Sequence, residues 1–309
     1  MNLRAAFVMV NHNGGEETLA SVNSLLADLS DDDLLILVDN GTTDGSGVRA
    51  SHLSGRVYYI GHDDNKPFAE ATNIGIRYAL ECGFPYIGLI NPDVRVQPGM
   101  VDSLATFLDN DRHEHIAAVS PVILYDSPDD RIWYAGGQVL FPISWTRHNG
   151  QHERLSEFRK SPFDTQFVTG CCWLSPAWAW DDHGELDSSY GMYAEDVDWS
   201  TRVWRAEKRM VVNPEAVLVH NVSASSGGGR SPLKMAYRTL AGRLFFERWT
   251  PPCLRFVRRL LTPPFVVFYT AFLYLADGPK PAIAYLRAWR TKLKDPVPWP
   301  PSRNLTGNL

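Results

Sequence analysis

Three polar segments of the sequence each close a short apolar run. They are Asp39 after Leu34–Val38, Asn91-Pro92-Asp93 after Tyr86–Ile90, and His220 after Ala216–Val219. Short apolar runs of this kind predict buried strands, and polar groups at the carboxyl ends of parallel strands face the crevice where open α/β sheets bind ligands. Two acids and a histidine gathered in such a crevice could hold a nucleotide, a divalent metal ion and a phosphate group. The pattern predicts an enzyme.

The ends of the first two predicted strands indicate a nucleotide pocket. Asn11 and Asn13 follow the run Ala5–Val10, and Asp39 could accept hydrogen bonds from a base or a ribose, as the acid after strand two does in Rossmann sites. The glycine fingerprint of dinucleotide sites is missing after the first strand, which argues against NAD. Asp39 and the two residues after it can equally form a simple turn, and the residues alone leave both readings open.

An acid directly after a hydrophobic strand can hold a divalent cation, which in turn screens a diphosphate. Asp93 has this position. The alternative is helix capping, because Pro98 lies only five residues on and opens a predicted helix. Read alone, this motif favours capping, so the metal reading depends on the other motifs.

Three acids lie within four residues at the start of another predicted helix. Glu195, Asp196 and Asp198 can simply complement the helix dipole, or they can include a general base, for which one well-placed carboxylate suffices. The helix start is expected to favour the charged form of Asp196. His220 read alone most often has a structural role, but its place before the glycine- and serine-rich stretch 223–230 favours a ligand beside a movable lid.

Alternating strand and helix patterns must position these residues. The predicted strands are Ala5–Val10, Leu34–Val38, Val57–Ile60, Tyr86–Ile90, Ala117–Leu124, Phe167–Ser175 and Met210–His220, and the predicted helices are Glu16–Leu29, Ala69–Leu80, Pro98–Leu108, Glu195–Lys208 and Lys234–Trp249. Such alternation implies a parallel sheet with helices on both faces, joined by right-handed crossovers. The stretch 133–163 has no clear periodicity, and 296–309 reads as an irregular tail.

Composition narrows the class of protein. A net charge of −5 argues against nucleic acid as the main partner, and 44% hydrophobic residues are ordinary for a globular chain. The four cysteines lack a zinc spacing and read as buried free thiols of a reducing cytoplasm. We find no secretory signal and no run of about 20 apolar residues, since the nearest stretch, Pro263–Ala276, is short and interrupted by prolines.

The order of these motifs is more specific than any one of them. The chain resembles the inverting, GT-A-type family 2 glycosyltransferases, and within them the bacterial rhamnosyltransferase-like branch. The matching segments lie between about residues 5 and 225 and are Val10–Gly15, Val38–Ser46, Asn65–Ala69, Thr72–Gly75, Leu89–Asp93, Thr169–Cys171, Tyr193–Arg202 and His220. The resemblance implies a GT-A, Rossmann-like α/β catalytic domain over 1–230 and a helical, basic and aromatic C-terminal region over 231–309.

The resemblance also implies a role for each matching residue. The donor-binding set is Asn11, Asn13, Asp39, Asn40, Asn73, Asn91 and Asp93, with Asn11, Asn13 and Asp39 at the base and ribose and Asn73 near the diphosphate or the sugar. Asp93 stands at the last position of the D-x-D motif and would bind Mg²⁺ or Mn²⁺ with His220, while Asp196 would be the catalytic base. Asn91 replaces the first acid of that motif, so the metal would depend more on diphosphate oxygens.

The function implied is transfer of a sugar, first L-rhamnose from dTDP-rhamnose, to a glycan or a lipid-linked glycan with inversion at the anomeric carbon. A UDP-hexose donor is the second choice. A nucleotidyltransferase ranks lower, because residues 11–15 lack the basic residue of its phosphate loop. A non-catalytic nucleotide-sugar-binding scaffold is disfavoured because Asp93, Asp196 and His220 are all present. Acceptor, linkage and oligomeric state do not follow from the sequence.

The C-terminal region is basic although the whole chain is acidic, since thirteen of the thirty basic residues lie between Lys234 and Arg303. A basic, aromatic helical segment over 254–294 can lie on an anionic membrane surface. It can equally form a helical subdomain that packs on the catalytic domain or on a second subunit. We therefore expect a cytoplasmic protein, peripheral at the inner face of the plasma membrane if the first reading holds.

Overall fold

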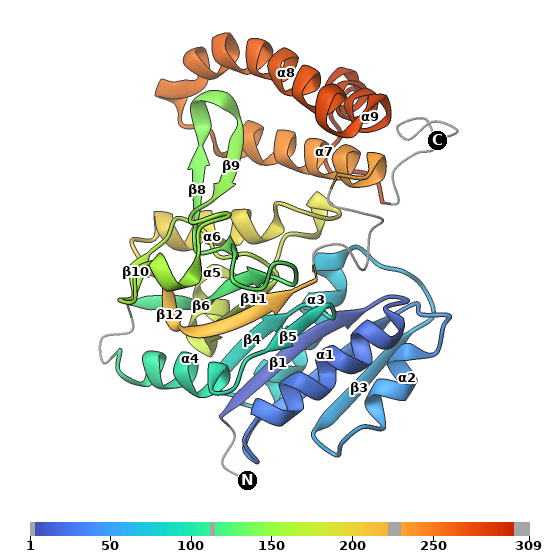
Figure 1. The fold of residues 1–309 in the computed structure, drawn as a ribbon, viewed down its shortest axis with the longest axis vertical. Coiled ribbons are helices and arrows are strands. Elements are labelled where there is room, and N and C mark those ends of the chain that lie inside the picture. The colour runs from blue at the N-terminus through green and yellow to red at the C-terminus, as the bar shows by residue number, and fades with distance from the viewer. Residues whose placement is uncertain (1–3, 112–114, 222–229, 300–309) are drawn as a thin grey trace.

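The computed structural model describes residues 4–111, 115–221 and 230–299, and its centre is one large β-sheet (Figure 1). Four strands pair in parallel in the order β4-β1-β2-β3, and helices connect them in sequence. The elements are β1 (Ala5–Asn11), α1 (Gly15–Asp28), β2 (Leu34–Asn40), α2 (Ser46–Ser51), β3 (Val57–His62), α3 (Phe68–Glu81) and β4 (Tyr86–Ile90). The expected β-α-β alternation is confirmed in this part of the chain.

The other half of the sheet is mixed. Its long path runs β10-β12-β6-β11-β4-β1-β2-β3, and β11 is antiparallel to both of its neighbours. The strands added here are β6 (Ile116–Tyr125), β10 (Phe163–Asp164), β11 (Cys172–Pro176) and β12 (Arg209–His220). The strand expected over 167–175 begins only at Cys172, because the backbone before it bonds side chains instead: the carbonyl of Phe167 accepts from Tyr134 and the N–H of Gly170 donates to Asp196.

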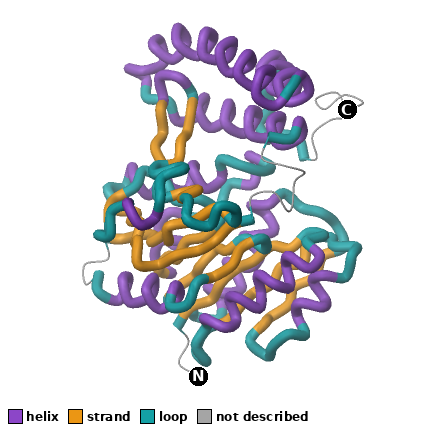
Figure 2. The backbone as a smooth tube through the Cα atoms, viewed as in Figure 1, coloured by secondary structure: helices purple, strands orange, loops and turns teal. Residues whose placement is uncertain are grey.

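Helices cover both faces of the sheet, as Figure 2 shows. Alternate residues of β1 point into two separate buried cores, which is the period of a strand. Ala5, Phe7 and Met9 join the core formed with α1 and α4 (Met100–Asp109), while Ala6 and Val8 join the core formed with α3 and α6 (Glu195–Arg205). All seven residues of β1 are buried, as expected for a strand covered on both sides.

Two predicted helices begin or end elsewhere. The helix expected from Pro98 begins at Met100, because Gly99 adopts φ 82° and the Asp28 carboxylate accepts hydrogen bonds from the N–H groups of Gly99 and Val101. The helix expected to reach Lys208 ends at Arg205. A short helix not predicted from the sequence, α5 (Ala177–His183), follows β11 directly.

The stretch without clear periodicity contains short strands. They are β7 (Ile132–Tyr134), β8 (Gly137–Leu140) and β9 (Trp145–His148). The β8–β9 hairpin stands away from the sheet and reaches the C-terminal helices (Figure 1). Its aromatic side chains pack there, Phe141 against Phe245 and Trp145 against Tyr269. Strands of four residues are too short for the alternation of apolar and polar residues to be recognised.

Three helices form the C-terminal layer: α7 (Pro232–Trp249), α8 (Arg255–Asp277) and α9 (Pro279–Arg290). One side of α8 packs on α9, where Val266 and Leu273 share a small core with Tyr285. The segment Pro252–Asp277 contains an 18-residue window of mean hydropathy 1.4 and is long and apolar enough by length and composition to cross a membrane. The expectation that no segment has that length was therefore wrong, because the helix continues through Pro263 and Pro264.

The described chain ends by returning to the sheet domain. The indole N–H of Trp299 donates to the carbonyl of Asn65 at 3.0 Å. The N–H of Val297 donates to the carbonyl of Ser189 at 2.7 Å. Residues 297–299 thus contact two loops of the sheet domain.

The cysteines match the expectation only in part. None of the four forms a disulfide, and Cys171 and Cys172 are buried. Cys82 and Cys253 are exposed, so the prediction that all four are buried was wrong. Both lie near the ends of surface helices, where the apolar cores do not reach.

Candidate functional site

Two of the three strand-end residues meet at the edge of the sheet. The short strand β5 (Val94–Val96) pairs antiparallel with the end of β12, so that Val94 lies opposite His220. This pairing brings His220 Nε2 to 3.2 Å from Asp93 Oδ1. Both side chains are nearly buried, at 8% and 7% exposure. The structure therefore joins an imidazole nitrogen and a carboxylate oxygen, 127 positions apart in the sequence (220 less 93), at one point.

The alternative of helix capping does not describe Asp93. Gly99 is the N-cap of α4, and Asp28 supplies the carboxylate that its first N–H groups need. The other ring nitrogen of His220, Nδ1, is buried and has no hydrogen-bond partner among the residues that the structure describes. The ring centroids of Trp133 and His220 are 4.6 Å apart, and the two rings are nearly perpendicular. The predicted lid, 223–230, lies outside the described residues apart from Arg230.

Asp196 lies next to the same strand end. The N–H of Gly170 donates to Asp196 Oδ2 at 2.9 Å. The next residue, Cys171, accepts at its carbonyl from the N–H of Asn91, also at 2.9 Å. Two successive residues thus hold the candidate base and the Asn91-Pro92-Asp93 turn together. This bridge, which the sequence did not predict, brings all three candidate chemical groups into one site.

The environment of Asp196 raises its pKa, mainly because the carboxylate is surrounded by protein. Hydrogen bonds from the N–H groups of Gly170 and Val197, and the positive charge of Arg238, oppose this rise without reversing it. The expectation that the helix start favours the charged form was therefore wrong, because burial outweighs the helix dipole here. The neighbouring Glu195 is also buried, and burial together with the charge of Asp196 raises its pKa.

The turn before α6 is strained. Tyr193 and Ala194 both adopt φ 70°, in the left-handed region that non-glycine residues rarely occupy. Such conformations cost about 1–3 kcal/mol each and persist where the surrounding structure imposes them, often at functional sites. The strain fixes the direction in which α6 begins, and with it the position of Asp196.

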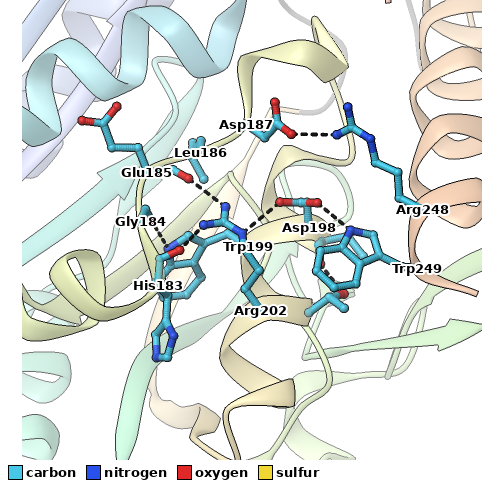
Figure 3. Close-up of polar contacts among 12 residues, drawn as sticks. His183, Gly184, Glu185, Leu186, Asp187, Asp198, Trp199, Arg202, Arg248 and Trp249 are labelled. Carbon is cyan, nitrogen blue, oxygen red and sulfur yellow. Dashed lines mark hydrogen bonds and ion pairs between the residues drawn. The ribbon is translucent and has the colours of Figure 1, made fainter. Parts of the chain in front are cut away.

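Asp198, one of the three acids, joins separate parts of the fold (Figure 3). Its Oδ1 accepts from the Tyr190 hydroxyl at 2.7 Å and from the Trp249 indole at 2.6 Å, and its Oδ2 accepts from Arg202 Nε at 3.0 Å. Arg202 also donates to the carbonyls of His183 and Glu185. Because Trp249 ends α7, this hub fastens the C-terminal layer to the helix that carries Asp196.

The hub borders an open hollow of about 480 Å³. Asp198, Arg202 and Trp249 line it together with Arg248, which forms an ion pair with Asp187 at 2.7 Å. None of the three candidate chemical groups lines this hollow. The hollow is therefore distinct from the place where those three groups meet.

Asn11 and Asp39 meet as expected. Asn11 Nδ2 donates to Asp39 Oδ1 at 3.1 Å, and the Tyr59 hydroxyl donates to Asp39 Oδ2 at 2.8 Å. The start of α2 packs directly on this carboxylate, since a Cβ on Gly47 would lie 2.2 Å from it. Asp39 is 5% exposed, and each of its oxygens keeps a lone pair for one further donor.

The remaining donor-binding candidates shape loops. Asn13 accepts from the N–H groups of Thr43 and Asp44. Asn40 bonds Lys66 through both atoms of its amide. Asn73 is engaged in the same way with the backbone of Leu186, at 2.8 and 3.0 Å. For Asn73 the contact anchors a loop, so the structure does not place it with the candidate chemical groups.

Several residues of the site received no role in the sequence analysis. Gly170 and Trp133 act through contacts with residues far away in the chain, which no local pattern records. For Asp198 a signal existed, because Arg202 follows at the i+4 spacing of a helical ion pair. Its two other donors, Tyr190 eight residues earlier and Trp249 51 residues later, do not have a helical spacing and could not be predicted from it.

Comparison with known proteins gives consistent matches. Residues 6–176 match the model of the family described as glycosyl transferase family 2. The chain is 27% identical over 216 residues to the N-acetylglucosaminyl-diphospho-decaprenol L-rhamnosyltransferase of Mycobacterium tuberculosis, covering 62% of this chain and 68% of that protein. It is 23% identical over 270 residues to the dTDP-rhamnosyl transferase RfbF of Shigella flexneri, covering 84% of this chain and 86% of that protein.

Solved structures share the fold. GalNAc-T7 with UDP, GalNAc and Mn²⁺ superposes with a TM-score of 0.60 at 16% identity, over 78% of this chain and 48% of that one, so this chain spans about half its length. The mannosyltransferase PcManGT from Pyrobaculum calidifontis, in complex with GDP-Man and Mn²⁺, gives a TM-score of 0.56 at 16% identity, over 94% and 80% of the two chains. At this identity the likeness establishes the GT-A architecture alone.

Proposed function

This chain belongs to glycosyl transferase family 2 and is rhamnosyltransferase-like, and on that premise we propose that it transfers L-rhamnose from dTDP-rhamnose to a glycan or lipid-linked glycan acceptor. The observation that carries the proposal is the bridge 170–171, which binds Asp196 on one side and the turn containing Asp93 on the other. In a single displacement the base and the diphosphate-binding group act on opposite sides of the same anomeric carbon, so both must line one site. A UDP-hexose donor remains the second candidate, since Asp39 suits either pyrimidine.

The Asp93–His220 pair fits a divalent cation. Its two candidate ligand atoms are 3.2 Å apart, a spacing that two bonds of about 2.1 Å can span. Across the described residues no group of three or more His, Cys, Asp or Glu could hold a metal. Water and donor phosphate oxygens would supply the other ligands, as is usual for Mg²⁺. A cation bound there would neutralise charge on the leaving diphosphate.

Asp196 is placed to take the proton of the acceptor hydroxyl. The N–H groups of Gly170 and Val197 hold its two oxygens, so the carboxylate keeps one orientation. As the hydroxyl oxygen attacks the anomeric carbon, its proton passes to the Asp196 carboxylate and the nucleoside diphosphate leaves. One displacement of this kind inverts the anomeric centre. The raised pKa of Asp196 makes its ionised form a stronger base than an ordinary aspartate.

A thermal-shift experiment tests the donor and the metal together. We expect dTDP to raise the melting temperature, and Mn²⁺ to increase that rise, because a ligand at 100 times its Kd stabilises by about 2.7 kcal/mol. His220→Ala should keep the effect of dTDP alone and lose the increment due to Mn²⁺. His52→Ala, at an exposed histidine, is the matched control. Equal Mn²⁺ increments in both variants would contradict the metal assignment, and a larger shift with UDP would change the donor. A donor-hydrolysis assay with Mn²⁺ separates an enzyme from a scaffold.

We also propose that α8 contacts an anionic membrane surface on the cytoplasmic side. Its outer side exposes large apolar residues: Phe256 is 71% exposed, Phe268 68% and Leu275 85%. Arg255 and Arg259 lie at its beginning, where they can meet lipid headgroups. Since its other side already packs on α9, both readings of the sequence apply, each to one side of the helix. Figure 1 supports this, because α8 lies at the end of the molecule farthest from the N-terminus.

Vesicle flotation tests the membrane contact. The variant Phe268→Glu/Leu275→Glu should lose most of its binding to vesicles containing phosphatidylglycerol, since two exposed apolar side chains are replaced by repelled charges. Val48→Glu, at an exposed valine of α2, should bind like the wild type. Unchanged flotation of the double variant would refute the contact. Loss of a dimer in light scattering, without a change in flotation, would assign this side of α8 to a second subunit.

A further inference from the structure

The first two turns of α7 present two cations on one side. Ser231 caps the helix by accepting from the N–H of Lys234, and Pro232 is its first residue. Lys234 and Arg238 are four residues apart and therefore lie one above the other on the same side of the helix. Ala241 and Phe245, about two turns further along α7, lie on the same side of the helix and belong to the main buried core. The helix N-terminus adds a partial positive charge next to the pair.

This side of α7 faces the candidate site. The buried core that contains Ala241 and Phe245 also contains Val94, which follows Asp93, and Tyr193 packs against it. At its other end α7 is fastened to α6 by the bond from Trp249 to Asp198. The two cations interact electrostatically with the candidate site. The charge of Arg238 limits the rise in the pKa of Asp196, and the charge of Asp93 limits the fall in the pKa of Lys234.

Neither cation forms a direct ion pair with a carboxylate among the residues that the structure describes. Three other basic residues of this layer do have partners: Arg243 donates to the carbonyls of Ala288 and Thr291, Arg248 pairs with two aspartates, and Arg258 pairs with Glu247. Neither Lys234 nor Arg238 forms an ion pair or a side-chain hydrogen bond within 4–111, 115–221 and 230–299. Lys234 is half-buried, and burial and the charge of Arg238 both lower its pKa. Such a pair of like charges is favourable only when an anion joins it.

The chemistry of the proposed reaction supplies that anion. Asn91 removes one of the two acids that would hold a metal beside the diphosphate, so a single carboxylate, Asp93, remains there. A leaving diphosphate needs positive charge from elsewhere, and guanidinium and ammonium groups are its usual protein ligands. We propose that Lys234 and Arg238 bind the diphosphate of the nucleotide donor from α7, an assignment that rests on the proposed transfer reaction. Both residues lie beyond 6–176, the part of the chain that matches the family.

Calorimetry with dTDP, thymidine and inorganic pyrophosphate in the presence of Mg²⁺ tests this assignment. Lys234→Ala/Arg238→Ala should weaken dTDP binding by roughly ten- to a hundredfold, since charge-assisted hydrogen bonds to phosphate are lost. Thymidine binding should not change, and pyrophosphate binding should be lost. Arg238→Lys, which keeps the charge, should recover part of the affinity. Lys280→Ala, at an exposed lysine of α9, removes the same charge elsewhere and should bind dTDP like the wild type.

The outcomes separate the two proposals. Unchanged dTDP affinity in the double variant would overturn the role of the cation pair and leave the transfer reaction standing. Equal loss of thymidine and dTDP binding would also overturn it, because the effect would then be on the fold of the pocket. A wild-type protein that binds no nucleoside diphosphate would refute the transfer reaction, and the pyrophosphate titration would still decide whether the pair binds an anion. If only the KM for a lipid-diphosphate acceptor rises, the pair belongs to the acceptor and the donor assignment is wrong.

Discussion

Asp196→Asn lowers kcat by about 10²–10⁴-fold, the usual contribution of a general base, and leaves donor affinity within about twofold of the wild type. Asparagine has the same shape and can still accept the hydrogen bond that Gly170 donates to Asp196 Oδ2. It cannot take a proton from the acceptor hydroxyl. A transfer assay measures the first effect and calorimetry with dTDP the second.

Glu195→Gln is the matched control, since it removes the adjacent carboxyl group. Burial raises the pKa of Glu195 to about 8, so this group is largely neutral at pH 7, and the amide should replace it with little loss of turnover. Retained transfer in Asp196→Asn, or lost donor affinity, would remove Asp196 from the role of base. If only Glu195→Gln were inactive, the two residues would exchange roles.

The pH profile of the wild type adds a signature that depends on burial. A general base acts only when ionised, and burial raises the pKa of Asp196 above its ordinary value of 3.8. The rate should therefore fall as the pH decreases through the raised value, at a higher pH than an exposed aspartate would give. A profile of kcat against pH that stays flat down to pH 4 would contradict this environment.

Asp198→Ala should destabilise the protein by about 3–5 kcal/mol, the cost of removing one partner of a buried ion pair. The Tyr190 hydroxyl, the Trp249 indole and Arg202 Nε would all lose their acceptor (Figure 3). Urea denaturation measures the free energy of unfolding. The rate of sugar transfer should also decrease at urea concentrations below the unfolding transition, because the hub fixes the helix that carries Asp196.

Two variants define this effect. Asp198→Asn keeps one acceptor oxygen and the shape of the side chain, so we expect a smaller loss of stability. Asp182→Ala, at an exposed aspartate of α5, should stay within about 0.5 kcal/mol of the wild type. A loss below 1 kcal/mol for Asp198→Ala would mean that water replaces the carboxylate, and the hub would then not hold the layers together.

The sequence predicts the fold well where the contacts are local. Each parallel strand of the first half is an apolar run with a helix after it, so β1 to β4 are located within one or two residues. The direction of β11 is not predictable in this way, because it depends on partners in β4 and β6. The β8–β9 hairpin was missed for a related reason: its aromatic residues pack on helices that lie about 100 residues later.

The candidate site, like the fold, was predictable only in the features that do not depend on contacts between distant segments. Residue types and their order indicated Asp93, His220 and Asp196, and the resemblance to a family gave them roles. What holds them together, the bridge 170–171 and the pairing of β5 with β12, forms between distant segments. The ionisation of Asp196 was misjudged because a helix start is visible in a sequence, whereas burial of the carboxylate depends on the packing of the whole domain.

The contacts of residues 297–299 with the sheet domain have a consequence for synthesis of the protein. The bond from Trp299 to Asn65 spans 234 positions, and the bond from Trp249 to Asp198 spans 51. At about 5–20 residues per second, translation separates the two partners by roughly 3–10 seconds at the hub and by roughly 10–50 seconds at the chain end. During that interval the nascent sheet domain carries Asp196 on a helix to which α7 is not yet bonded. The candidate site can therefore assemble completely only late in translation, after the C-terminal helices and residues 297–299 have been synthesised.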